Sequence, residues 1–257
     1  MPTHCVTLWI GRSLGPIERA CLASALRHGH QVALYCYRAP DGIPRGVEVR
    51  DAAKILPESA IIRHRTGSPS LFSNWFRYEL LRRGLGTWID CDIYFVKPLE
   101  DTSPLLFGNQ DEGVIGTGVL RLPPESPLLP DLIDLFRERR VPPWLPLRAR
   151  LAALWRLVWH GKTGISEMPW GVAGPQALTA LAQEHRLAQH ALPTDVFCPV
   201  SWREAEWVFD PGATLAERVS PRTVSVHLWN EMLRRRTCRN AAKGSFMRQL
   251  MEEAQAA

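Results

Sequence analysis

Hydrophobic positions in the first part of the chain alternate between the period of a strand and that of a helix. The apolar run 4–10 is followed by glycines and then by 17–28, where apolar residues recur at helical spacing. A second alternating run covers 31–37, and a short strand is expected at 47–50. Strand, helix and strand in this order predict a right-handed parallel α/β unit.

A second helix–strand unit follows. A helix is expected from Ser73, which, like Asn74, is able to cap its N-terminus, and the helix stops at the glycines of 84–86. The apolar run 87–96 then predicts a buried strand, and 114–122 predicts another.

The remaining pattern is mainly helical. Helices are expected at 126–139 and 174–184, with a Trp- and Arg-rich segment at 142–164 between them. A late strand at 224–229 and a terminal basic helix close the chain. The predicted fold class is therefore α/β, as a single domain over 1–257, with a helical excursion around 126–165.

The amino-acid composition limits the kinds of ligand and the cellular compartment that can be expected. The net charge is +5 and 27 of the 31 basic residues are Arg, which fits a phosphorylated ligand or an anionic membrane surface; no nucleic-acid partner is expected. Six scattered cysteines lack zinc spacing, and the first residues lack a secretory signal. These features predict reduced thiols in a cytoplasmic protein.

The strongest candidate chemistry is Asp90-Cys91-Asp92, two carboxylates within an apolar run. Acids at i and i+2 of an extended chain point to the same side, and burying them is costly without a cation. A divalent ion would neutralise the pair, so the motif suggests a seat for Mg²⁺ or Mn²⁺ and a diphosphate. A strand-end turn or a capping pair is the structural alternative.

Other polar or aromatic positions fall where strands end or helices begin. Trp9, in Trp9-Ile10-Gly11, is placed to stack on a nucleobase or to belong to the core. Asn74 and Arg77 share a helix face and could form an anion or sugar-hydroxyl site, or a cap and a surface Arg. His227 and Asn230 could complete a metal shell or serve the structure.

The segment Trp144–Trp159 has a Trp-rich apolar arc, with Arg148, Arg150 and Arg156 outside it. This pattern is typical of an interfacial membrane helix, and the commoner alternative is an amphipathic helix packed on its own core. The first alternative predicts peripheral association with the inner face of the membrane.

The sequence motifs and their order along the chain together resemble a known family. The chain is similar to the retaining glycosyltransferases of family 32, which carry a sugar-binding region with an Asp-x-Asp motif and include bacterial capsular and lipooligosaccharide galactosyltransferases. The motifs that carry the resemblance are Trp9-Ile10-Gly11, Ser73-Asn74-Trp75-Phe76-Arg77-Tyr78-Glu79-Leu80-Leu81, Gly86-Thr87-Trp88-Ile89-Asp90-Cys91-Asp92, Gly174-Pro175-Gln176-Ala177-Leu178-Thr179 and His227-Leu228-Trp229-Asn230.

The resemblance implies a GT-A fold, with a nucleotide-sugar-binding half at about 1–122 and an acceptor-side half at about 123–257. It implies a nucleotide-sugar donor, a UDP-sugar being expected, held through Mn²⁺ or Mg²⁺. Asp92 would coordinate the metal, with His227 and Asn230 as further candidate ligands. The expected catalytic residues are Asp90, Asp92 and Arg77, and the expected donor-binding residues are Trp9, Gly11, Asn74, Arg77, Asp90 and Trp229.

One departure from the family matters for function. The family usually has Ser-Asp where this chain has Ser73-Asn74, so a charge expected at the donor hydroxyls is missing. The predicted function is a metal-dependent retaining hexosyltransferase acting on a glycan or lipid-linked acceptor. The alternatives are a catalytically impaired sugar-binding protein and a metal-dependent phosphodiester hydrolase, for which Asp111 and Glu112 would have to supplement the motif.

Overall fold

A five-stranded sheet forms the centre of the computed structural model, which describes residues 3–100, 103–233 and 241–257. The strand order is β3-β2-β1-β4-β8; β1 to β4 are parallel and β8 runs antiparallel to β4. These strands are β1 (His4–Leu8), β2 (Gln31–Cys36), β3 (Glu48–Asp51), β4 (Thr87–Ile89) and β8 (Val119–Leu120). The predicted α/β class, with a mostly parallel sheet flanked by helices, is confirmed.

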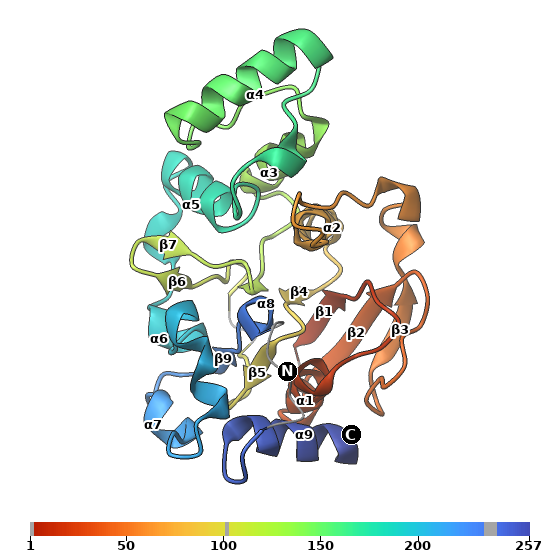
Figure 1. Ribbon diagram of the computed structural model, residues 1–257, viewed down its shortest axis with the longest axis vertical. Coiled ribbons are helices and arrows are strands. Elements are labelled where there is room, and N and C mark those ends of the chain that lie inside the picture. The colour runs from red at the N-terminus through yellow and green to blue at the C-terminus, as the bar shows by residue number, and fades with distance from the viewer. Residues whose placement is uncertain (1–2, 101–102, 234–240) are drawn as a thin grey trace.

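Strand alternation divides the apolar residues between two cores. Val6 and Leu8 of β1 belong to one cluster, and Cys5 of the same strand belongs to the other. Helix α1 (Pro16–Arg27) and helix α9 (Phe246–Ala256) cover the second face, while α2 (Ser70–Arg82) covers the first (Figure 1). The sheet is thus buried on both faces, as parallel sheets require.

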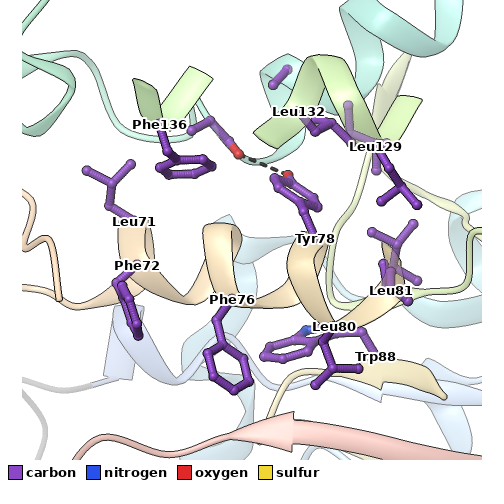
Figure 2. Close-up of a cluster of buried hydrophobic side chains, with 14 of the residues drawn as sticks. Leu71, Phe72, Phe76, Tyr78, Leu80, Leu81, Trp88, Leu129, Leu132 and Phe136 are labelled. Atoms are coloured by element: carbon purple, nitrogen blue, oxygen red, sulfur yellow. Dashed lines mark hydrogen bonds between the residues drawn. The ribbon is translucent and has the colours of Figure 1, made fainter. Parts of the chain in front are cut away.

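Helix α2 has apolar side chains on two sides, and these pack against the sheet on one side and against the segment around Phe136 on the other. Phe72 and Phe76 lie one turn apart and point toward the sheet, while Tyr78 points toward Phe136 (Figure 2). The hydroxyl of Tyr78 donates to the carbonyl of Ala173 at 2.9 Å. Each fully buried aromatic side chain stabilises the fold by roughly 1.5–3 kcal/mol. The helix therefore forms a rigid support for its polar residues.

The prediction of one strand over 87–96 is wrong. Strand β4 ends at Ile89, and β5 (Ile93–Phe95) pairs antiparallel with β9 (Ser225–His227) in a separate sheet. The Asp90 N–H donates to the Gly118 carbonyl at 2.7 Å, and the Ile93 N–H donates to the Asp90 carbonyl at 3.1 Å. The two acids therefore lie in a turn between sheets, where carboxylates are less costly than inside a strand.

Two further boundaries differ from the prediction. The run 114–122 divides into β7 (Val114–Ile115), which pairs with β6 (Asn109–Asp111), and β8. The second helix begins at Ser70, because the Ser73 N–H already donates to the Pro69 carbonyl at 2.9 Å. Neither Ser73 nor Asn74 caps it.

The second half of the chain is helical, as expected. Helices α3 and α4 form the predicted excursion at one end of the long axis, and α5, the predicted helix at 174–184, packs against α3 (Figure 1). The helices are α3 (Leu128–Asp134), α4 (Leu147–His160), α5 (Pro175–Glu184), α6 (Thr194–Phe197), α7 (Leu215–Arg218) and α8 (Asn230–Leu233). Among the described residues, 3₁₀ segments lie in the first half at Ala52–Lys54 and Glu58–Ala60, and in the second half at Leu135–Arg137, Ile165–Glu167, Ala188–His190 and Trp202–Phe209.

The basic stretch predicted to follow Trp229 as a helix lies largely at 234–240, outside the described residues. In the described parts of the chain, none of the helices has the length and apolar character needed to span a bilayer. The proposed division at 122/123 stays a prediction.

Candidate active site

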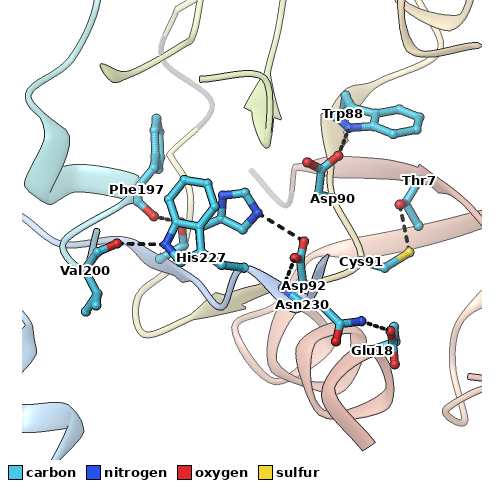
Figure 3. Close-up of polar contacts among 12 residues, drawn as sticks. Thr7, Glu18, Trp88, Asp90, Cys91, Asp92, Phe197, Val200, His227 and Asn230 are labelled. Atoms are coloured by element: carbon cyan, nitrogen blue, oxygen red, sulfur yellow. Dashed lines mark hydrogen bonds and ion pairs between the residues drawn. The ribbon is translucent and has the colours of Figure 1, made fainter. Parts of the chain in front are cut away.

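The turn after β4 brings Asp90 and Asp92 to the carboxyl edge of the parallel sheet, where ligands bind in α/β folds. Between them, Cys91 turns inward, and its Sγ lies 3.2 Å from Oγ1 of Thr7 on β1 (Figure 3). Burial raises the pKa of the Cys91 thiol, so this side chain stays neutral. Cys91 anchors the turn, and the two flanking carboxylates are left for polar partners.

Arg77 connects α2 to the first of these acids. Its guanidinium donates to Asp90 Oδ1 and to Asn74 Oδ1, both at 2.5 Å, and lies over the Trp88 ring, 4.7 Å from its centroid. The Trp88 indole N–H also donates to Asp90 Oδ1, at 2.7 Å. Since Arg77 is only 3% exposed, its position favours orienting Asp90 and Asn74 over contacting a donor itself.

Asp92 is held by the strand and loop that contain His227. Its Oδ1 lies 3.3 Å from His227 Nε2, and its Oδ2 accepts from the backbone N–H of Asn230 at 2.9 Å (Figure 3). Burial acts to raise the pKa of Asp92, but the charge of His227 and the hydrogen bonds from His227 and Asn230 outweigh it and lower that pKa. Burial alone would lower the pKa of His227, but the charge of Asp92 and its hydrogen bond outweigh burial and raise that pKa.

Asp90, Asp92 and His227 together form a candidate metal centre. Each offers one ligand atom, and these atoms lie within 4.8 Å of one another. Gly118 borders the cluster, because a Cβ built there would lie 3.5 Å from both Asp90 Oδ2 and His227 Cε1. The two carboxylate oxygens suit Mn²⁺ or Mg²⁺, and the imidazole nitrogen is a softer ligand that Mn²⁺ accepts more readily, so the residues present fit Mn²⁺ better than Mg²⁺.

Trp229, which is predicted to contact the donor, lies beside His227 of the cluster. Its ring stacks on His227 with centroids 3.9 Å apart, and its indole N–H donates to the Val200 carbonyl at 2.8 Å. Its φ of 55° is the left-handed conformation that a bulky residue adopts only under structural constraint. Trp229 is therefore placed to hold His227 in position.

Glu18 is a site residue that the sequence interpretation missed. It is 4% exposed on the first turn of α1, and its carboxylate accepts a hydrogen bond from the Asn230 side chain. Burial is the main cause of its raised pKa, and the nearby charge of Asp92 adds to it. A signal existed, because Glu18 falls on the same helix face as Cys21, Leu22 and Ala25, where an acid needs a partner.

Trp9 and Gly11 follow β1 at the same sheet edge as the acids, because β1 and β4 are parallel neighbours. Trp9 is half-buried, and its Nε1 finds no partner among the described residues. A Cβ at Gly11 would lie 2.9 Å from that nitrogen. The indole N–H of Trp9 is therefore a buried hydrogen-bond donor without a partner among the described residues, and the close approach of Gly11 leaves little room for a side chain at position 11.

Asn74 faces a small pocket between α2 and the segment before α5. The pocket is lined by His64, Ser70, Leu71, Asn74, Ile165, Pro169, Trp170, Gly171, Val172 and Ala173. Gly174 contacts Asn74 closely, since a Cβ there would lie 3.0 Å from Asn74 Nδ2. The predicted motif that starts at Gly174 therefore contributes to the surroundings of Asn74.

Part of the chain is similar to glycosyltransferases, as the sequence predicts. Residues 166–254, about a third of the chain, match the family model described as the alpha 1,4-glycosyltransferase conserved region. This region includes His227, Trp229 and Asn230 but begins after Asp90 and Asp92, so it leaves the Asp-x-Asp motif untested.

Among solved structures, the PaToxG glycosyltransferase is similar to this chain, with 16% identity and a TM-score of 0.41 over 71% of this chain and 69% of that one. No curated protein matches the sequence.

Proposed function

We propose that the chain is a metal-dependent retaining glycosyltransferase. It moves a hexose from a nucleotide sugar, a UDP-sugar, to a cell-surface glycan or glycolipid precursor. The observation that carries the proposal is the gathering of Asp90, Asp92 and His227, whose ligand atoms lie within 4.8 Å of one another. The carboxylate oxygens suit Mn²⁺ or Mg²⁺, and the imidazole nitrogen favours Mn²⁺ of the two.

In this proposal Asp92 and His227 hold the ion, and Asp90 receives ribose or donor hydroxyls. When bound, the ion stabilises the negative charge that develops on the departing diphosphate. Arg77 and Trp88 fix Asp90 through hydrogen bonds of 2.5 Å and 2.7 Å, so its carboxylate is oriented before the donor arrives. Trp9 offers the base an aromatic surface and a free indole N–H.

We further propose that the anomeric configuration is retained through attack on the face that the leaving group occupies. The acceptor oxygen bonds to the anomeric carbon as the carbon–oxygen bond to the diphosphate breaks, and the acceptor proton passes to a phosphate oxygen. The nearby carboxylates of Glu18, Asp90 and Asp92 already have hydrogen-bond partners, which supports a reaction without a protein nucleophile. A trapped glycosyl–enzyme adduct would refute this step.

Donor turnover tests the function. A panel of nucleotide sugars with Mn²⁺ should reveal one that raises the melting temperature and is slowly hydrolysed to free sugar and nucleoside diphosphate. Asp92→Asn should abolish both effects, whereas Asp111→Asn should keep them, since Asp111 pairs with Arg203 at an exposed site. Retention of both effects in Asp92→Asn would overturn the metal assignment.

The two alternatives predict other results. Donor binding without turnover would indicate the impaired sugar-binding protein, which the missing charge at Asn74 motivates. Hydrolysis of a phosphodiester with no preference for nucleotide sugars would indicate the hydrolase, although Asp111 and Glu112 do not join the metal cluster among the described residues. The cytoplasmic location and the position at the inner face of the membrane stay predictions that cell fractionation can test.

A further inference from the structure

Helix α4 lies at one end of the long axis, beyond α3 and α5 (Figure 1). Ala153 is its one buried residue, and Ala149 packs partly against the core. The structural alternative considered for this segment, an amphipathic helix whose apolar face packs on its own core, is therefore wrong. Alanines provide the contact, and the large apolar side chains face outward.

The exposed side chains of α4 form one apolar arc. At about 100° per residue they cover roughly 140° of the helix circumference. Leu147 is 71% exposed, Val158 77% and Trp159 69%. The arc consists of Leu147, Leu151, Leu154, Trp155, Val158 and Trp159. Trp144, assigned to this arc from the sequence, precedes the helix and donates to the Val172 carbonyl at 2.9 Å.

The charge around this arc has one sign. Between Glu138 and Glu167 the chain contains no acidic residue. The same stretch contains six basic residues, Arg139, Arg140, Arg148, Arg150, Arg156 and Lys162. An apolar arc with basic flanks complements a surface that is negatively charged outside and apolar beneath.

We propose that the α4 arc seats on an anionic lipid bilayer, a role that goes beyond the transfer reaction and does not depend on it. Trp155 and Trp159 lie at the level of the headgroups, and Leu147 and Val158 enter the acyl boundary. A second copy of the chain is a poorer occupant. A two-fold contact through α4 would bring the same basic flanks together with no acid from this segment to pair them.

Vesicle co-sedimentation of the whole chain tests the proposal. Vesicles of phosphatidylglycerol and phosphatidylcholine in equal parts should bind it, and vesicles of phosphatidylcholine alone should bind it much less. The double variant Trp155→Ala/Trp159→Ala should weaken binding about tenfold or more, because two exposed aromatic anchors are lost. Arg148→Gln and Arg150→Gln should each weaken it about fivefold, and added salt should weaken it further.

Trp202→Ala is the matched control, since Trp202 is 40% exposed on a distant 3₁₀ segment, and its binding should equal that of the wild type. Circular dichroism and donor hydrolysis should be unchanged in the Trp155→Ala/Trp159→Ala variant. A failure of the proposed transfer function can therefore be distinguished from a failure of the membrane-binding proposal. Absence of binding to the anionic vesicles, or equal binding by the double variant, would overturn the proposal. So would a concentration-dependent dimer that the double variant abolishes.

Discussion

Replacing Arg77 by Lys tests whether the candidate site is held in place by one buried guanidinium. Arg77 forms two hydrogen bonds of 2.5 Å to oxygens of Asn74 and Asp90, and it lies 4.7 Å from the Trp88 ring centroid. Lys keeps the charge, but its single ammonium cannot reproduce the planar fork that reaches both oxygens.

The expected loss follows from these contacts. A hydrogen bond to a charged group contributes about 1.5–3 kcal/mol, and a desolvated cation–π contact adds up to about 2 kcal/mol. The Asp90 side chain is 24% exposed, so hydrogen bonds to water replace part of the stabilisation that the Arg77 hydrogen bonds provide. We expect the free energy of unfolding to fall by about 3 kcal/mol, which corresponds to a melting temperature about 6–12 °C lower.

Urea unfolding followed by circular dichroism measures the effect as a lower midpoint with an unchanged m-value. Arg82→Lys is the matched control on the same helix, because Arg82 is 50% exposed and pairs with Glu79 at 2.7 Å. Lys at position 82 keeps the charge, and its exposed head leaves Glu79 a cationic or water partner, so the control should lose less than about 1 kcal/mol and stay close to wild type. Equal midpoints for the two variants would refute the view that Arg77 anchors the site.

Three further predictions concern donor and metal. Asn74→Asp should raise kcat/KM for donor hydrolysis about tenfold, because a charged acceptor binds hydroxyls more strongly than a neutral one; an unchanged value would show that the departure at 74 is neutral. Glu18→Ala should weaken Mn²⁺ binding by about tenfold or more in calorimetry, while Glu18→Gln, which still accepts from Asn230, should stay near wild type. Mn²⁺ should bind at least about fivefold more tightly with UDP present than without it, and identical dissociation constants would contradict this coupling.

The first β-α-β unit could be predicted from the sequence nearly to the residue. Strand and helix periods differ clearly there, and the expected helix 17–28 is observed as α1, Pro16–Arg27. The run 87–96 could not be predicted as two strands. A hydrophobic pattern records that both parts are buried, but not that the chain leaves one sheet at Asp90 and enters another at Ile93.

Much of the candidate site could also be predicted, with roles that the structure changes. The sequence indicated Asp90, Asp92 and His227, and the fold brings their ligand atoms together. Residues that support these three were harder to assign. The stacking of Trp229 on His227 depends on a left-handed backbone at Trp229 that no local pattern predicts. Glu18 stands out as an acid on an apolar helix face, but its partner Asn230 comes from a distant segment.

The charge balance of the site explains why metal and donor binding should be coupled. Before an ion binds, each acid of the cluster faces a basic partner: Arg77 lies 2.5 Å from Asp90, and His227, which must give up its proton to bind a metal, lies 3.3 Å from Asp92. A divalent ion that arrives alone therefore adds positive charge where the carboxylates are already compensated. A diphosphate supplies the missing negative charge, so ion and donor each lower the electrostatic cost of the other. This reciprocity requires Asp90 to keep Arg77 as its partner, which is why the rigid support beneath Arg77 matters as much as the ligand atoms themselves.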